Sequence, residues 1–118
     1  MAKDYAEIYE HLNEMIERLG DAAPATMAGF GALHEAGSES GALDTKTKEL
    51  IALAIGIAVH CDGCISYHAH DALDAGASRE EIVETIGVAV MMGGGPSVVY
   101  GCQALEATDQ FERRAAAV

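Results

Sequence analysis

The sequence predicts an all-α protein, a compact bundle of about six helices. Apolar residues recur at three- and four-residue steps along most of the chain, and no stretch shows the two-residue alternation of a half-buried strand. Alanine and glycine are abundant, whereas there are only two prolines, four tyrosines and two phenylalanines. The length of 118 residues predicts one domain spanning residues 1–118.

The charge of the chain argues against several classes of partner. Its formal net charge is −12 and its isoelectric point is about 4.5, so a nucleic acid or an anionic membrane surface would repel it. No apolar run reaches the roughly 18 residues that a membrane span needs. The first residues lack an apolar signal region, and we therefore expect a cytoplasmic protein. In that reducing compartment three cysteines do not indicate a structural disulfide framework.

Two helices are predicted in the first third of the chain. Apolar residues between 4 and 19 form one stripe, and Gly20 is expected to end this helix. The stripe consists of Tyr5, Ile8, Tyr9, Leu12, Met15, Ile16 and Leu19. A second helix is expected to begin near Pro24, which suits a first helical turn. The polar, glycine-containing segment 37–41 is expected to be a loop.

The third predicted helix, 45–60, is the most apolar. Asp44 is its expected N-cap, and after a polar first turn residues 50–59 are apolar on all sides. Such a helix is expected to be buried all round, with Gly56 allowing another helix to approach closely.

Three more helices complete the prediction. The fourth spans 64–75 and ends at Gly76, and residues 78–81 form a capping box that opens the fifth. The segment 93–96 breaks the fifth helix, and the last helix runs from about 96 to 107 or beyond. Because a small monomer has limited interior for two nearly apolar helices, we expect a homo-oligomer.

The reactive side chains are concentrated in residues 60–70, which contain two of the three cysteines and three of the five histidines. With Cys61 at a helix start, its sulfur and that of Cys64 lie on one face, close enough for a disulfide. The positive potential of a helix N-terminus stabilises a thiolate there. His68 follows Cys64 by four residues, so it lies on the same face and can take a proton. Glu49 either faces solvent or orients His68, and both interpretations stay open.

These residues resemble a known signature. Glu49, eleven residues, Cys61-Asp62-Gly63-Cys64, three residues and His68 are similar to the motif of the alkylhydroperoxidase D-like branch of the carboxymuconolactone decarboxylase family. The likeness covers about 45–105. It implies an all-helical fold, trimers or hexamers, and a thiol-dependent peroxidase or disulfide reductase that acts on alkyl hydroperoxides. Cys64 would attack the peroxide, Cys61 would resolve the sulfenic acid, and Glu49 with His68 would relay protons.

The same resemblance implies an external dithiol or thioredoxin-like reductant, and neither an organic cofactor nor a metal. One position departs from the peroxidase-type motif, which has a histidine immediately before the second cysteine, where this chain has Gly63. This difference is expected to affect the peroxidase rate more than the disulfide chemistry. The decarboxylase branch lacks the cysteine pair, so the pair argues against lactone decarboxylation.

Two alternative functions remain. Glu49 and His68 could serve as an acid–base pair on a small lactone-like acid, as in a carboxymuconolactone decarboxylase-type enzyme. A metal-binding module could instead use Cys61, Cys64, His68 and either His60 or His70. The remaining candidates are expected to be structural. Cys102 is expected to be a buried packing cysteine, His11 and His34 surface or rim residues, and His70 a solvated histidine. Tyr67 and Tyr100 could line a pocket, but packing is the more usual role of an aromatic side chain on a helix.

Overall fold

The computed structural model describes residues 2–117, and this part of the chain forms six helices without a strand. The all-α prediction is therefore confirmed. The helices are α1 (Tyr5–Ala22), α2 (Pro24–Ser38), α3 (Thr45–Ala58), α4 (Asp62–Asp74), α5 (Arg79–Gly93) and α6 (Gly95–Ala116). Within residues 2–117, none of the helices combines the length and the apolar character required to cross a bilayer.

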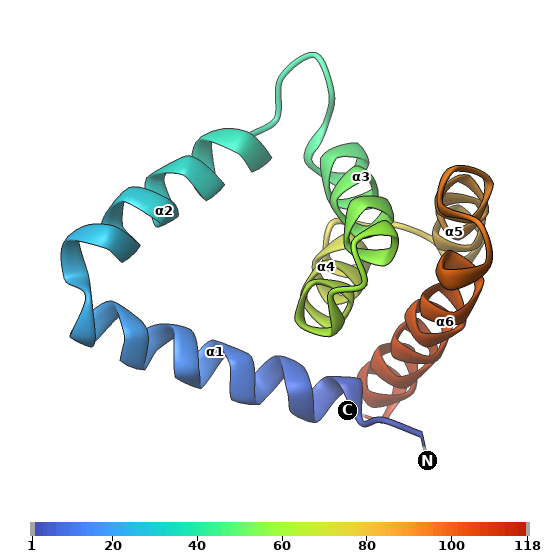
Figure 1. The fold of residues 1–118 in the computed structure, drawn as a ribbon, viewed down its shortest axis with the longest axis horizontal. Helices are drawn as coiled ribbons and strands as arrows, with labels where there is room; N and C mark the ends of the chain where they lie inside the picture. Colours follow the sequence, from blue (N-terminus) through green and yellow to red (C-terminus); the bar gives the residue numbers. More distant parts are fainter. Residues whose placement is uncertain (1, 118) are drawn as a thin grey trace.

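The core lies between α3, α4, α5 and α6, and α1 runs along α4 and α6 (Figure 1). It is made of aliphatic and alanine side chains together with two aromatic rings. Its larger members are Tyr5, Leu53, Ile57, Ile65, Ile82 and Phe111. In Figure 1, α2 turns away from the end of α1 and the chain returns through a loop to α3. No residue of α2 is buried, so this helix stands apart from the core.

Local capping chemistry sets most helix boundaries. The Asp44 carboxylate accepts the Thr47 N–H at 2.8 Å, as predicted for an N-cap. The capping box of Ser78 and Glu81 is complete. Gly76 has a positive φ of 96° just after α4, and the Ala77 N–H donates to the Ala72 carbonyl, which is the hydrogen bond of a Schellman end.

Several predicted boundaries were wrong by a few residues. Gly20 does not end α1, which continues to Ala22, because Pro24 is the residue that excludes the helical conformation from Ala23. The fourth helix begins at Asp62, two residues early, because the Cys61 side chain caps it. The third helix ends at Ala58, two residues earlier than predicted, whereas the end of the last helix at Ala116 agrees with the prediction of 107 or beyond.

The prediction that the third helix is buried on all sides was wrong for the single chain. Leu53 and Ile57 are fully buried, but Ile51, Ile55 and Val59 are 46%, 58% and 63% exposed. The neighbouring helices cover one side of α3 and leave the opposite side open. Gly56, in contrast, does provide a close approach, since a Cβ atom there would lie 3.0 Å from the Cβ of Cys64.

Candidate active site

The turn between α3 and α4 carries a non-glycine residue in the left-handed region. His60 has a φ of 61°, and the Cys61 N–H donates to the Gly56 carbonyl at 3.0 Å. The His60 N–H donates to the Ile57 carbonyl at 3.2 Å, which completes a Schellman end that usually has glycine at this position. The His60 ring stacks on Tyr100 of α6, with centroids 4.6 Å apart and an angle of 7°. This turn delivers Cys61 to the start of α4.

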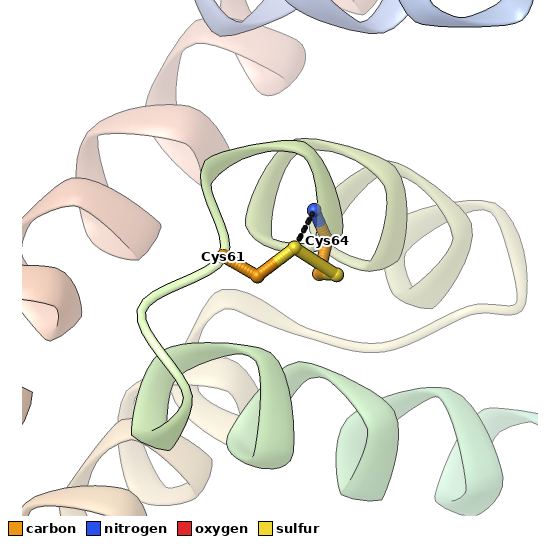
Figure 2. Close-up of a disulfide and its surroundings, with 2 residues drawn as sticks. All are labelled: Cys61 and Cys64. Atoms are coloured by element: carbon orange, nitrogen blue, oxygen red, sulfur yellow. Dashed lines mark hydrogen bonds between the residues drawn. A yellow bond between two sulfur atoms is a disulfide. The ribbon is translucent and has the colours of Figure 1, made fainter.

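Cys61 and Cys64 form a disulfide, with their Cα atoms 5.2 Å apart (Figure 2). Cys61 is the N-cap of α4, and its sulfur accepts the Cys64 N–H at 3.1 Å, the dashed line in Figure 2. The Cys61 sulfur therefore lies at the positive end of the α4 helix dipole. Both cysteines are half-buried.

Glu49 belongs to this site and does not face solvent. Its Oε2 lies 2.7 Å from Nδ1 of His68, and the two side chains are only 7% and 20% exposed. The pairing of α3 with α4 brings these residues together. Asp71, one turn after His68, joins them: ligand-type atoms of Glu49, His68 and Asp71 all lie within 4.8 Å of one another.

A cavity of about 600 Å³ opens beside the second cysteine. Gly63, Cys64, Tyr67 and His68 form its α4 wall. The other walls come mainly from apolar residues of α1 and α2: Leu12, Ile16, Pro24, Met27, Ala28 and Phe30. Burial, and then the negative charge of Asp71, raises the pKa of Tyr67, so its hydroxyl stays protonated and able to donate. Of the two roles expected for Tyr67, packing or lining a pocket, the structure shows the second.

The other histidines lie elsewhere. His11 and His34 are exposed, as predicted, and the His34 side chain also lines the rim of the cavity. His70 is not simply solvated: its ring stacks on Tyr9 at 4.0 Å, and its Nδ1 lies 2.9 Å from an Asp71 oxygen.

The candidate ligands of the metal-binding alternative have other partners in this structure. Cys61 and Cys64 are joined to each other, and His60 and His70 are engaged with Tyr100 and Asp71. Among residues 2–117, the histidine and carboxylate side chains that cluster are those of Glu49, His68 and Asp71.

The prediction for Cys102 was wrong, because this cysteine is exposed. On α6 its neighbour Gly101 faces α5, where a Cβ atom would lie 2.7 Å from the Ile86 side chain. Successive helical residues are rotated by about 100°, so Cys102 points away from that contact.

The stacking of Tyr100 on His60 agrees with the packing role expected for Tyr100.

Sequence reasoning missed several residues around the site. Lys3, ahead of α1, pairs with Asp62 inside the Cys-Asp-Gly-Cys segment. Leu12 of α1 faces Gly63, where an added Cβ would lie 3.3 Å from its Cδ2. Local sequence spacing contains no signal for these contacts. The spacing could have identified Asp71, because it lies three residues after His68 and therefore on the same helical face.

Known proteins are similar to this chain in sequence and in fold. The model of the carboxymuconolactone decarboxylase family matches residues 24–107. An uncharacterised protein of Cupriavidus necator is 35% identical over 105 residues, which are 89% of this chain and 93% of that protein. An uncharacterised protein of Haemophilus influenzae is 37% identical over 107 residues, 91% of this chain and 95% of that protein.

Two crystal structures are similar throughout. The apo structure of a carboxymuconolactone decarboxylase family protein from Legionella pneumophila is 43% identical, with a TM-score of 0.88 over 91% of this chain and 96% of that one. A family protein of Thermotoga maritima, for which a role in an antioxidative response has been suggested, is 31% identical, with a TM-score of 0.78 over 97% and 94% of the two chains. The motif formed by Glu49, Cys61, Cys64 and His68 is consistent with the alkylhydroperoxidase D-like branch. The chain belongs to the carboxymuconolactone decarboxylase family.

Proposed function

We propose that this protein is a thiol-dependent peroxidase that reduces organic hydroperoxides through the Cys61–Cys64 pair. The observation that carries the proposal is the disulfide at the start of α4, next to a hydrogen-bonded glutamate and histidine and a cavity. The suggested antioxidative role of the Thermotoga maritima protein supports the same chemistry.

Cys64 is the proposed nucleophile because it lines the cavity together with His68. His68 takes the thiol proton, and the Cys64 thiolate attacks the terminal peroxide oxygen. The oxygen–oxygen bond breaks, the sulfur becomes a sulfenic acid, and the departing alkoxide receives the proton back from His68 as an alcohol. Because Nδ1 of His68 is held by Glu49, Nε2 is the nitrogen proposed to carry this proton.

Cys61 then resolves the sulfenic acid. Its thiolate attacks the Cys64 sulfur, the disulfide forms, and hydroxide leaves and is protonated to water. An external dithiol, small or carried by a thioredoxin-like protein, reduces the disulfide and becomes oxidised in turn. In sum, one hydroperoxide and one dithiol give one alcohol, one water and one disulfide. A cytoplasmic location supplies the reducing environment that this cycle needs.

The cavity walls support an organic hydroperoxide as the substrate rather than hydrogen peroxide. Apolar side chains of α1 and α2 offer surface to an alkyl or aryl group, while the protonated Tyr67 hydroxyl can donate to a peroxide oxygen. We expect cumene hydroperoxide to be consumed with a higher kcat/KM than hydrogen peroxide.

The test uses the reduced protein and a Cys102→Ser background, which removes the exposed third thiol. One equivalent of cumene hydroperoxide should lower the mass by two hydrogen atoms as the disulfide forms. In Cys61→Ser a sulfenic acid should accumulate at Cys64, and Cys64→Ser should lose peroxide consumption. Peroxide consumption that survives in Cys64→Ser would refute this role of Cys64.

The family match keeps a second function under consideration, decarboxylation of a small lactone-like acid by Glu49 and His68. This acid–base chemistry does not use sulfur. If the double variant Cys61→Ser/Cys64→Ser retained a decarboxylase activity that His68→Gln abolished, the second function would replace the first.

A further inference from the structure

The segment before α1 is fastened to two helices that carry or support the site. The Tyr5 side chain is fully buried, and its N–H donates to Gln110 of α6 at 2.6 Å. The Gln110 side-chain amide donates in turn to the Lys3 carbonyl at 2.6 Å. From α4, the buried hydroxyl of Ser66 donates to the Tyr5 carbonyl at 2.6 Å. Residues 3–5 are thereby held between α4 and α6.

This anchoring places the charge of Lys3 on the cysteine motif. Lys3 Nζ forms an ion pair with Oδ2 of Asp62, and it also lies 3.5 Å from the Gln103 side-chain oxygen. The same Gln103 oxygen accepts the Tyr5 hydroxyl at 2.8 Å. The other oxygen of Asp62, Oδ1, is buried and has no hydrogen-bond partner in the described part of the chain. Lys3 is therefore the counter-charge that the fold supplies to this carboxylate.

Asp62 directly follows Cys61 in the chain, and a carboxylate close to a thiol opposes formation of the thiolate. We propose that Lys3 offsets this opposition and thereby sets how readily the Cys61–Cys64 disulfide is reduced. Lys3 acts through Asp62 and is a positioning residue, not a catalytic one. The inference rests on the proposed disulfide cycle but concerns its thiol–disulfide equilibrium, which exists with or without peroxide.

Other titratable groups lie near the two cysteines. His60, in the turn before Cys61, stacks on Tyr100 of α6, and His68 of α4 is hydrogen-bonded to Glu49 of α3. Tyr5 of α1 has a pKa raised to about 12, first by burial and then by Asp62 and Glu106, so it is neutral at physiological pH. The charges of Lys3 and Asp62 can each be removed by a substitution that leaves the residues of the proposed relay unchanged.

The experiment compares Lys3→Gln, Asp62→Asn and the double variant, all with Cys102→Ser. Equilibration in dithiothreitol redox buffers gives the equilibrium constant for reduction, and alkylation by iodoacetamide against pH gives the apparent thiol pKa. Lys3→Gln should lower the equilibrium constant for reduction of the disulfide about two- to fivefold and raise the apparent thiol pKa. Asp62→Asn should shift both quantities in the opposite direction, and the double variant should return close to the parent.

The opposite signs separate an electrostatic role from a merely structural one, since loosening of the segment would shift both single variants the same way. Lys3→Arg, which keeps the charge, should behave like the parent. Lys46→Gln, which breaks the Lys46–Glu81 pair of 2.9 Å between α3 and α5, is the matched control and should not shift either quantity. Unchanged values in Lys3→Gln, or equal shifts in both single variants, would overturn the proposal. Loss of peroxidase activity alone would not affect it.

Discussion

Oε2 of Glu49 lies 2.7 Å from Nδ1 of His68, across 19 positions of sequence and between two different helices. Glu49 is almost fully buried, and a buried carboxylate is costly unless a partner compensates it. His68 provides that partner, and the hydrogen bond fixes the orientation of its ring. The contact therefore has both a structural and a chemical consequence.

Replacing Glu49 with glutamine keeps a hydrogen-bonding side chain but removes the charge. We expect kcat/KM for cumene hydroperoxide to fall on the order of a hundredfold, with a changed pH profile, because the glutamine cannot stabilise a protonated His68. Steady-state assays from pH 5 to 9 measure this. Asp109→Asn, which breaks the surface pair with Arg79 at 2.9 Å, is the control for loss of a carboxylate. A wild-type pH profile in Glu49→Gln would contradict the relay.

The turn at His60 can be tested with two variants that both remove the ring. His60→Ala keeps a Cβ in the left-handed region, whereas His60→Gly does not. Because that region costs a non-glycine residue about 1 kcal/mol, we expect the glycine variant to be more stable than the alanine variant by about 1 kcal/mol. Urea unfolding of both proteins measures the difference. Equal stability would mean that the turn relaxes when the Tyr100 stack is lost.

The space at Gly63 is limited by Leu12, whose Cδ2 would lie 3.3 Å from an added Cβ. The imidazole of the peroxidase-type motif therefore needs Leu12 to move. We expect the double variant Gly63→His/Leu12→Ala to consume cumene hydroperoxide faster than the parent, on the order of tenfold, because a second proton carrier then stands beside Cys64. Gly63→His alone should gain less, and Leu12→Ala alone is the control. A double variant no faster than Leu12→Ala would show that Gly63 does not limit the rate.

The exposed apolar side chains lead us to expect a homo-oligomer in solution. Leu33, Met91 and Met92 are 68%, 73% and 77% exposed, which is unfavourable on an isolated subunit. Multi-angle light scattering should give a mass several times 12.3 kDa, and Met92→Glu should reduce it. Arg18→Glu changes charge on the polar face of α1 and is the control. A wild-type mass of one subunit would contradict this expectation.

The capping box at α5 gives a pH-dependent contribution to stability. Accepting the Ser78 N–H at 2.9 Å, and then pairing with Lys46, holds the pKa of Glu81 below its ordinary 4.5. Its contribution is therefore complete above that value and is lost as the pH falls through the lower, folded-state pKa. Glu81→Gln should be less stable than wild type at pH 7, and the difference should become smaller as the pH falls below 4.5. Urea unfolding at a series of pH values tests this, and a difference that does not become smaller below 4.5 would contradict it.

Much of the fold could be predicted because its signals are local. Asp44, Ser78 and Gly76 mark helix ends through hydrogen bonds that span three to five positions, and periodicity identifies the helices between them. A predicted helix end was wrong where two nearby residues could each end the helix. Gly20 resembled a stop, but Pro24 is the residue that ends α1.

The sequence by itself determined how Cys61, Cys64 and His68 are arranged. They lie within the first turns of one helix, where their spacing alone places them on the same face. Only the tertiary structure decided what surrounds them. Whether Glu49 faced solvent or His68 depended on how α3 packs against α4, and the apolar cavity required α1 and α2. The contact of Lys3 with Asp62 bridges 59 positions, and the exposure of Cys102 depends on which face of α6 meets its neighbours. Such contacts follow from the burial of whole helix faces, which no local pattern contains.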